Sequence, residues 1–442
     1  TRKGFEITVL ESKKEPGGSM VTRYENGFLI DYGPNSGLET TPLIGKLVEQ
    51  IGLKDEMVYA LKKADKRYIL KNNQLHALPT HPAAFLKTKL FSLKAKLRLL
   101  AEPFSRKSHD GYYQSISEFV IRRLGREFLD YAVNPFVAGI FAGNPDNLSV
   151  QSALPKLYRL EELYGGLFKG MILGAQERKK RAEPSKQSAR MFSFKKGMQS
   201  FPAAIAAQLG SRIKYNCRVE SVIKSGRKFK VLYRHNNQLE EIITDIVLSA
   251  IPAYHAASII DDRDNKLFDH LNNIYYPPVK VLYLGFRKEA VGQVLDGFGF
   301  LIPEKENKTF LGAIWNSAIF PHRANDDMAA FTLFVGGARS PELCDNNDGS
   351  HINAVIEEFK QIMKIRKAPV FVTEKIWPKA IPQYSLGYIE HERYFETFEL
   401  NNPGIFLSGN YRGGISVGDC IKNSELTVNR ICEHINRGVG RR

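Results

Sequence analysis

FEITVLE, residues 5–11, followed by SKKEPGGS, residues 12–19, is the stretch of sequence that decides the fold. Its first six residues are a short apolar run rich in β-forming residues, and Glu11 follows directly at the end of that run. A carboxylate at the end of a strand, shortly before a glycine pair, is typical of the second strand of a dinucleotide-binding βαβ unit. The glycine pair lets the backbone approach a ligand where a Cβ atom would collide with it.

The same motif requires a glycine-rich loop about 20 residues before the acid. Only ten residues precede Glu11 in the sequence. The pattern therefore predicts a further strand with a G-x-G-x-x-G loop before Thr1 in the natural protein, and the alternative is a relative that has lost this loop. A plain surface strand ending at Glu11 explains the first run equally well, so the interpretation depends on the segments that follow.

A Gly-Pro turn, YGPNS at residues 32–36, comes after the next predicted strand pair. Such a turn is rigid, and its backbone groups stay free for a ligand. With the glycine pair it provides the N-terminal candidates for binding a cofactor: Gly17, Gly18, Ser19, Gly33, Pro34, Asn35 and Ser36.

A second glycine-rich turn lies near the C-terminus, where a buried-type strand at residues 403–408 leads into GNYRGGISVGD at residues 409–419. A helical pattern begins near Asp419. The turn into a helix presents free N–H groups and the positive end of the helix dipole, which suit an anionic group. A plain βα turn is the alternative. The candidates here are Gly409, Asn410, Ile415, Ser416 and Val417.

The composition limits the class of protein. A net charge of +16 favours anionic partners but does not choose among nucleic acid, acidic lipid and an acidic small molecule. The four cysteines lack metal-binding spacing, which argues for a reducing compartment and against a metal centre. No run approaches the roughly 18 apolar residues of a membrane-spanning helix, so we expect a soluble or peripheral protein.

Many ordered stretches resemble the protoporphyrinogen oxidases of the flavin amine-oxidase superfamily, over nearly the whole chain. FAGNPDNLS at residues 141–149 and WPKAIPQY at residues 377–384 are the most family-specific. The glycine motifs are shared across the superfamily. The other matching stretches are KRYIL (66–70), NPF (134–136), FKKGM (194–198), YPPV (276–279), GFGFLIP (297–303), FPHRA (320–324) and FVGGA (334–338).

The resemblance implies an α/β fold in which a discontinuous Rossmann-like FAD-binding domain carries an antiparallel-sheet substrate domain and an inserted helical, membrane-associating domain. Strand patterns joined by Ser-Gly and Asn-Asn turns predict a β-meander with strands at residues 212–216, 218–224, 228–234 and 239–251, after a helix at 194–209. We expect FAD-binding segments at 1–64, 191–265 and 381–442, substrate-domain segments at 65–81 and 266–380, and the helical domain at 82–190.

Residues 85–100, FLKTKLFSLKAKLRLL, predict one amphipathic helix with five leucines near one face and basic residues on the rest. A soluble helix would pack these leucines on the core, and the periodicity favours this interpretation. The resemblance favours a helix on a bilayer surface, where a basic residue near anionic lipid contributes about 1 kcal/mol. Residues 176–191 predict a mobile basic loop.

Chemistry at a cofactor suits this sequence, because we find no metal-ligand spacing, no nucleophile arrangement and no catalytic side chain. The resemblance implies non-covalently bound FAD, whose N5 takes a hydride from a methylene bridge of a porphyrinogen. Oxygen is the implied acceptor and hydrogen peroxide the by-product. Three rounds would convert protoporphyrinogen IX into protoporphyrin IX in haem biosynthesis.

The same resemblance assigns individual residues. Arg67 would face a propionate of the substrate, although an exposed strand arginine is the alternative. Gly299 and Leu301 would border the ring, with glycine leaving room for the reacting carbon, and Phe334 would lie on the other side. On the cofactor side the remaining assignments are Glu11 to the adenosine ribose, Val219 to the adenine, and Trp377.

Three alternatives stay open. The first is oxidation of coproporphyrinogen III, which carries more propionates. The second is another oxidase or desaturase of the superfamily, although Cys420 falls inside the last predicted helix and so argues against covalent flavin attachment. The third is a non-catalytic basic protein that binds a membrane or nucleic acid. Dispersed basic residues and the lack of a nucleic-acid motif argue against nucleic acid. The resemblance further implies peripheral association with the cytoplasmic membrane, or an organellar membrane in a eukaryote, and a homodimer.

Overall fold

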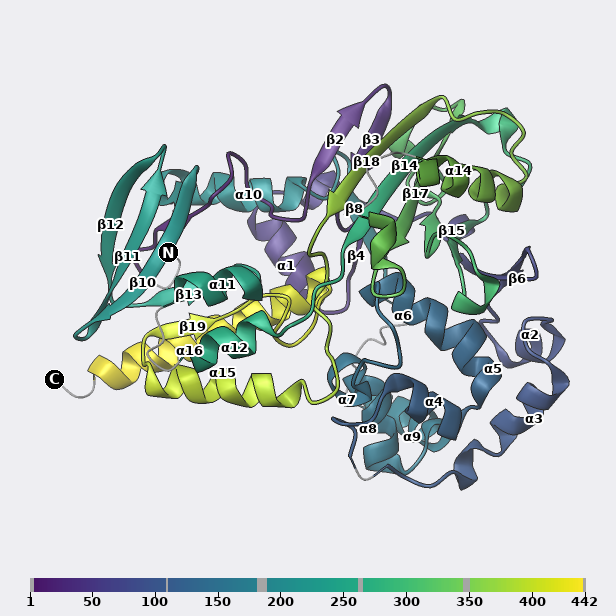
Figure 1. Ribbon diagram of the computed structural model, residues 1–442, viewed down its shortest axis with the longest axis horizontal. Coiled ribbons are helices and arrows are strands. Elements are labelled where there is room, and N and C mark those ends of the chain that lie inside the picture. The colour runs from purple at the N-terminus through teal and green to yellow at the C-terminus, as the bar shows by residue number, and fades with distance from the viewer. Residues whose placement is uncertain (1–3, 109, 181–188, 261–264, 345–349, 440–442) are drawn as a thin grey trace.

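A computed structural model describes residues 4–108, 110–180, 189–260, 265–344 and 350–439. Figure 1 shows a large sheet at the upper right, a lobe of helices at the lower right, and a group of short strands and helices on the left. The chain enters the sheet and the left-hand group more than once, so segments far apart in the sequence share a layer.

The large sheet has seven strands in the order β18-β14-β17-β16-β15-β6-β7. Neighbouring strands are antiparallel except β15 and β6, which run parallel. The sheet is therefore mixed, because a hairpin from the N-terminal segment joins it beside β15. The strands are β6 (Lys66–Lys71), β7 (Gln74–Ala77), β14 (Val279–Arg287), β15 (Gly297–Leu301), β16 (Gly312–Ile314), β17 (Met328–Gly336) and β18 (Phe371–Trp377).

Burial of β14 on both faces explains its nearly continuous apolar sequence, VKVLYLGF. Leu282 and Leu284 belong to one apolar cluster with Phe359 of α14 (Ser350–Met363). Val281 belongs to a second cluster on the opposite face of the sheet. The sheet therefore lies at the centre of the core.

Two pairs of short parallel strands belong to the left-hand group, and Figure 1 labels the two strands of one pair, β13 and β19. β1 (Val9–Leu10) pairs with β9 (Ile213–Lys214), and β13 (Val247–Ser249) pairs with β19 (Ile405–Leu407). Parallel strands with flanking helices are the arrangement of a Rossmann-like domain. The helices are α1 (Pro42–Gln50), α10 (Ser200–Leu209), α11 (Ala253–Ile259), α12 (Lys266–Asn272), α15 (Ile389–Asn401) and α16 (Val417–Val439).

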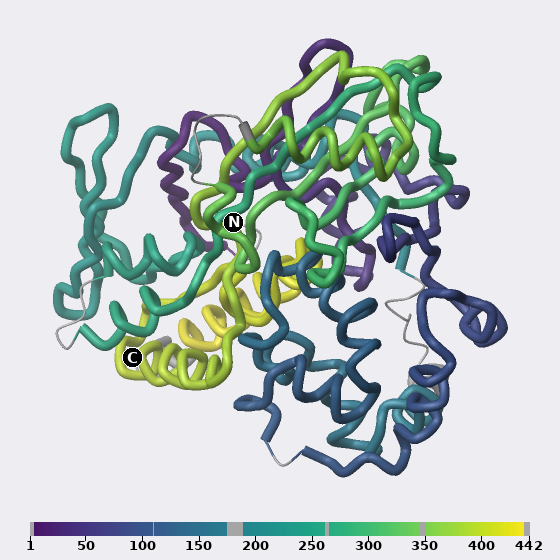
Figure 2. The backbone as a smooth tube through the Cα atoms, turned by 45° about the vertical axis from the view of Figure 1, so that its right-hand side comes forward, coloured from purple at the N-terminus to yellow at the C-terminus, as the bar shows by residue number. Residues whose placement is uncertain are grey.

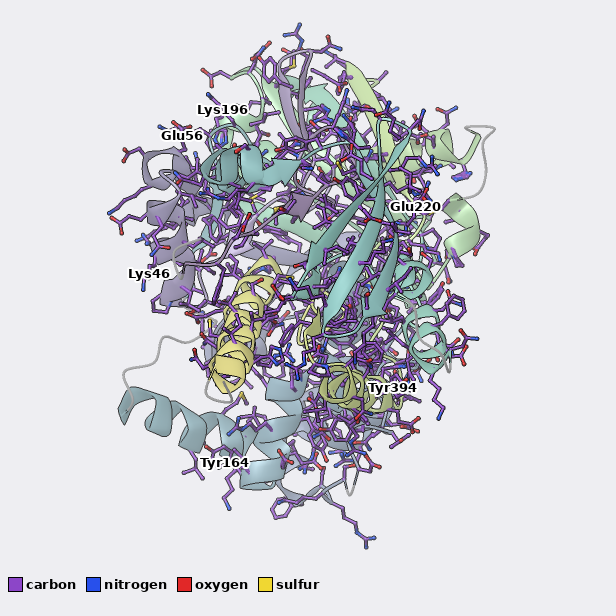
Figure 3. The ribbon with its side chains drawn as sticks, turned by 90° about the vertical axis from the view of Figure 1, so that its left-hand side faces the viewer. Lys46, Glu56, Tyr164, Lys196, Glu220 and Tyr394 are labelled. Atoms are coloured by element: carbon purple, nitrogen blue, oxygen red, sulfur yellow. The ribbon has the colours of Figure 1, made fainter. Side chains whose placement is uncertain are left out.

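Helices from the N-terminal and C-terminal parts of the described chain meet in this group. Figure 2 shows the N-terminal segment near the C-terminal helix, and α1 contacts α16. Tyr394 of α15 stacks on His270 of α12 with ring centroids 4.2 Å apart, and Figure 3 shows Tyr394 on its helix. Smaller sheets connect the group to the large sheet through β2 (Thr22–Glu25), β3 (Phe28–Asp31), β4 (Gly37–Leu38), β5 (Met57–Tyr59) and β8 (Met191–Phe194).

The antiparallel meander consists of β10 (Cys217–Ser225), β11 (Lys228–His235) and β12 (Gln238–Thr244). Glu220, labelled in Figure 3, pairs with Arg234 across β10 and β11 at 2.8 Å. The predicted strand 239–251 is wrong as a single element, because β12 ends at Thr244 and β13 joins β19 in a different sheet. The predicted helix at 194–209 begins only at Ser200.

The helical lobe lies beneath the large sheet (Figures 1 and 2). Its α9 continues to Lys180, so the first part of the predicted basic loop at 176–191 is helical, and residues 181–188 lie outside the described residues. The helices are α2 (Pro82–Lys87), α3 (Leu93–Leu100), α4 (Ile116–Arg123), α5 (Arg126–Phe128), a π-helical turn (Leu129–Val133), α6 (Asn134–Phe141), α7 (Val150–Ala153), α8 (Pro155–Tyr164) and α9 (Leu167–Lys180).

Residues 85–100 do not form one helix. The chain breaks between α2 and α3, where Leu90 is buried and Phe91 stacks on Phe128 with ring centroids 4.3 Å apart. Ser92 starts α3, since its Oγ accepts a hydrogen bond from the Ala95 amide at 3.1 Å. Burial of two adjacent apolar residues therefore overrides the helical periodicity.

No described helix is both long enough and apolar enough to span a bilayer.

Candidate active site

A cavity of about 4640 Å³ extends from the parallel strands to the large sheet. Every residue that the sequence analysis assigned to a cofactor or substrate lines it. On the cofactor side these are Glu11, Gly17, Gly18, Ser19, Gly33, Pro34, Asn35, Ser36, Val219, Trp377, Gly409, Asn410, Ile415, Ser416 and Val417. On the substrate side they are Arg67, Gly299, Leu301 and Phe334.

Glu11 lies at the carboxyl end of β1. Its amide donates to the Lys214 carbonyl at 2.9 Å, which continues the pairing of β1 with β9. Its Oε1 accepts a hydrogen bond from the Lys13 amide at 2.8 Å. The carboxylate is thus held beside the cavity at the strand end, as the motif predicts.

Close backbone contacts explain two of the N-terminal glycines. A Cβ atom on Gly33 would lie 1.9 Å from the Ser19 carbonyl oxygen, and one on Gly17 would lie 2.6 Å from the Met20 carbonyl oxygen. A side chain at position 33 would push the two cavity-lining segments apart, and one at position 17 would disturb the tight turn from Gly17 to Met20. Trp377 fixes the start of the same turn, because its Nε1 donates to the Tyr32 carbonyl at 2.8 Å.

The C-terminal turn enters α16 at Val417, two residues before the predicted start at Asp419. Ser416 caps the helix: its Oγ accepts from the Asp419 amide at 3.1 Å and donates to Asp419 Oδ2 at 2.6 Å. Val417, the first residue of α16, lines the cavity, so the positive end of the helix dipole lies at the cavity wall, which suits an anionic group.

Four neighbouring strands, β17, β16, β15 and β6, align the substrate-side residues. Gly299 is paired with Arg67 of β6, Leu301 with Gly312, and Gly312 with Phe334. Arg67 is exposed at the cavity rim, and its guanidinium lies 5.8 Å from the ring centroid of Phe298. The arrangement combines one cation with apolar walls.

The large sheet itself requires a glycine at position 299, which the sequence did not reveal. Its φ of +141° is unfavourable for other residues, and a Cβ atom would lie 2.0 Å from the Ala313 carbonyl oxygen on β16. The glycine is therefore needed by the sheet itself, whatever occupies the cavity.

A sequence profile of the family described as "Flavin containing amine oxidoreductase" matches residues 1–432. The chain belongs to this flavin-containing oxidoreductase family. It is 32% identical to the mitochondrial protoporphyrinogen oxidase of Nicotiana tabacum, over 95% of this chain and 88% of that protein. It is 27% identical to the coproporphyrinogen III oxidase of Bacillus subtilis strain 168, over 97% and 91%.

The fold agrees with a solved structure from Exiguobacterium sp. 255-15, at a TM-score of 0.78 and 22% identity, covering 96% of this chain and 92% of that one. The family membership makes the protein an FAD-dependent oxidoreductase. Its cavity fits a flavin dinucleotide: an acid ends β1, glycines are required where two backbone segments meet, and a helix N-terminus closes the wall.

Two buried tyrosines hold the C-terminal turn of this flavoprotein, and sequence reasoning missed both. The Tyr384 hydroxyl donates to the Asn410 carbonyl and accepts from the Gly414 amide, each at 2.8 Å. Tyr388 donates to the Tyr411 carbonyl at 2.6 Å. Burial raises the pKa of the Tyr384 hydroxyl, so it stays protonated. The signal was available, because Tyr384 ends the family-specific stretch WPKAIPQY.

Cys420 also lines the cavity. It lies within α16, beyond the turn, and its Sγ donates to the Gly414 carbonyl at 3.8 Å. Burial raises the pKa of this thiol to about 11, so the nucleophilic thiolate is scarce at neutral pH. This environment agrees with the expectation of non-covalent FAD.

The Asn35 side chain forms hydrogen bonds within the protein that the sequence did not predict. Its Oδ1 accepts from Asn316 Nδ2 at 2.7 Å, and its Nδ2 donates to the Gly33 carbonyl at 3.2 Å. The side chain is therefore committed to the protein, and the backbone of the turn is the part that remains available for a ligand.

Proposed function

We propose that the protein oxidises a porphyrinogen, with protoporphyrinogen IX as the substrate. The observation that carries this is the pairing of Arg67 with Gly299 at the rim of a cavity whose walls include Leu301 and Phe334. A porphyrinogen is an apolar macrocycle with carboxylates at one edge, and this combination of cation and apolar wall suits it. The names of the plant relatives support the same substrate.

Bound FAD would supply the hydride acceptor, with oxygen as the proposed final acceptor. Arg67 would bind a propionate and orient the ring, while Leu301 and Phe334 would exclude water from it. Glu11 would accept hydrogen bonds from the ribose, and the amides at the start of α16 would stabilise negative charge on the reduced flavin. Val219, which lines the cavity at a β-bulge, would contact the adenine through its backbone.

A direct assay tests the proposal. The purified protein is reconstituted with FAD, its flavin absorbance is recorded, and porphyrin fluorescence is followed after addition of protoporphyrinogen IX in air. We expect a yellow protein, porphyrin formation and hydrogen peroxide. A protein that binds FAD but forms no porphyrin above the uncatalysed rate would contradict the proposal.

Coproporphyrinogen III is the second candidate substrate. Lys62, Arg159 and Arg190 also line the cavity, and additional cations suit a substrate with additional propionates. The bacterial relatives named coproporphyrinogen III oxidase support it. Initial rates with both porphyrinogens, compared as kcat/KM, decide between them.

The parallel strands support a further proposal about the FAD-binding domain. Each pair leaves a strand edge without a partner among the described residues, and Leu10 of β1 and Leu248 of β13 line the same cavity. Leu248 is 44% exposed there. We propose that a strand followed by a glycine-rich loop lies between β1 and β13 and completes the site for the pyrophosphate.

Membrane docking is the proposed role of α2 and α3. Apolar side chains on this segment are exposed instead of packing on the core: Leu86, Leu93, Leu97, Leu100 and Phe104 are 70%, 73%, 57%, 70% and 88% exposed. Exposed lysines lie between them in the sequence, at Lys87, Lys89 and Lys94. An apolar surface bordered by lysines suits an anionic lipid surface. The homodimer stays a prediction.

A further inference from the structure

Arg323 is a buried cation close to the cofactor side of the cavity. It ends a short 3₁₀ helix, Pro321–Arg323, within the FPHRA stretch, and it is 1% exposed. Its Nη2 lies 2.6 Å from Asp31 Oδ2 and donates to Ser193 Oγ at 2.6 Å. The same nitrogen donates to the carbonyl oxygen of Asn35 at 3.4 Å. Three segments far apart in the sequence therefore meet at one guanidinium.

Asp31 extends this network. The residue ends β3 and is also 1% exposed. Its Oδ1 accepts hydrogen bonds from Thr22 Oγ1 at 2.5 Å and from the Met198 amide at 3.0 Å. The carboxylate thus ties the β2–β3 hairpin to the segment that leads into α10, and its second oxygen is left for Arg323.

The cavity-lining turn Gly33–Ser36 is held from two directions by the same stretch of the substrate domain. Arg323 binds the main-chain oxygen of Asn35, and Asn316 binds its side-chain oxygen at 2.7 Å. Both residues lie between β16 and β17, and β16 is the neighbour of β15, which carries Gly299. The position of the turn is therefore set by the substrate sheet.

The network is not arranged for greatest stability. Arg323 Nη1 has no hydrogen-bond partner among the described residues. A buried ion pair recovers its desolvation cost only when its hydrogen bonds are complete, and apolar residues of similar volume often stabilise a protein as well. Arg323 binds the turn directly at the Asn35 carbonyl and also contacts Asp31, two residues before the turn, which indicates a positioning role.

We propose that Arg323, together with Asp31, is a positioning residue that fixes the Gly33–Ser36 turn and so sets the place of FAD relative to the substrate sheet. The cofactor part of this inference rests on the proposed function. The positioning of the turn is independent of it.

The first measurement needs no cofactor. The Tyr32 amide donates to the Val21 carbonyl at 2.9 Å, and the Met198 amide donates to Asp31, so hydrogen exchange at both amides reports on the network. In Arg323→Gln we expect exchange at least 10-fold faster at both. Arg323→Lys keeps the charge but lacks the second nitrogen of the fork, and should recover only part of the protection.

The second measurement is the dissociation constant for FAD, from flavin fluorescence. We expect Arg323→Gln to bind FAD about 10-fold more weakly than the unaltered protein. Arg123→Gln is the matched control, because Arg123 is an equally buried arginine in the helical lobe, paired with Glu102 and Glu161. The control should lose thermal stability but keep both the exchange rates and the FAD affinity.

The double variant Asp31→Asn/Arg323→Gln guards against misfolding, since it leaves no unpaired buried charge. If it folds and exchanges slowly at Tyr32 and Met198, charge balance alone explains the pair and the proposal is overturned. Unchanged exchange in Arg323→Gln overturns it as well, as does weaker FAD binding in the Arg123 control. Loss of FAD binding in the unaltered protein would defeat the proposed function, while the exchange data would still decide the positioning role.

Discussion

Arg123 in the helical lobe and Arg323 beside the Gly33–Ser36 turn are both fully buried and both form ion pairs, but their contacts have different structural roles. Arg123 is held by Glu161 at Nε, Glu102 at Nη1 and the Gly165 carbonyl at Nη2, at 2.8, 3.0 and 2.9 Å. All of these partners lie in the helical lobe. Arg323 binds segments that include residues 31, 35 and 193, and it leaves one nitrogen without a hydrogen bond among the described residues.

The difference shows that burial of an arginine does not by itself indicate its role. Where every donor is satisfied within one domain, the network stabilises that domain. Where the donors reach across domains to a backbone oxygen on a cavity wall, the network determines the position of that wall. Variants in the two regions should therefore separate loss of stability from loss of ligand binding.

The largest effect on stability is expected for Arg123→Met. Removing the cation leaves Glu102 buried without an ion-pair partner among the described residues and leaves Glu161 with Arg122 alone, which costs about 3–5 kcal/mol of the free energy of unfolding. Urea denaturation monitored by circular dichroism measures it. Arg126→Met is the control, because that side chain is 73% exposed and pairs with Asp130, four residues later in the chain. A similar loss in both variants would contradict the contrast.

The second-largest effect is expected for lipid binding by the surface of the helical lobe. Reversing Lys87, Lys89 and Lys94 to glutamate should weaken binding to anionic liposomes by roughly 3 kcal/mol, about 1 kcal/mol per basic residue. Co-sedimentation at low salt measures it. The matched control reverses the exposed residues Lys224, Arg227 and Lys228 near the β10–β11 turn, for the same change in net charge. Equal losses would indicate non-specific charge attraction.

Arg67→Ala probes the cavity region away from the buried pair. Loss of a charge-assisted contact to a propionate should lower kcat/KM for the porphyrinogen about 10- to 100-fold. FAD content, read from the absorbance spectrum, should not change. Lys63→Ala, on the neighbouring exposed 3₁₀ turn, is the control and should retain full activity. An unchanged kcat/KM in Arg67→Ala would remove its assignment as the clamp.

The smallest effect is expected for Tyr384→Phe. The variant keeps the ring but loses the hydrogen bonds to Asn410 and Gly414, which costs about 1–2 kcal/mol in stability or FAD affinity. Isothermal titration with FAD and thermal unfolding measure the two. Tyr24→Phe is the control, since Tyr24 is 70% exposed. If the FAD affinity stays within twofold and the thermal stability is also unchanged, the C-terminal turn does not depend on this tyrosine.

Much of the fold was predictable, because strands and turns leave clear local patterns of apolar alternation and turn residues in the sequence. The meander strands at residues 217–235 and the strand with Glu11 at its end follow from alternation and turn residues. The helix at 85–100 failed, since the burial of Leu90 and Phe91 is a tertiary effect that periodicity does not contain. The strand at 239–251 failed because its second half pairs with β19, about 160 residues later in the chain.

By itself, the sequence determined which residues are chemically suited to the site: the acid after β1, the glycines at 17, 33, 299 and 409, and the cation at 67. The acid and the glycines at 17, 33 and 409 follow from local constraints on backbone and charge, whereas Gly299 and Arg67 follow from the family resemblance. Only the tertiary structure decided that these residues line one cavity, that Gly299 is required by the neighbouring strand, and that Arg323 holds the Gly33–Ser36 turn. Those contacts join residues separated by more than ten to nearly 300 positions, and no local pattern records which distant segments will pack together.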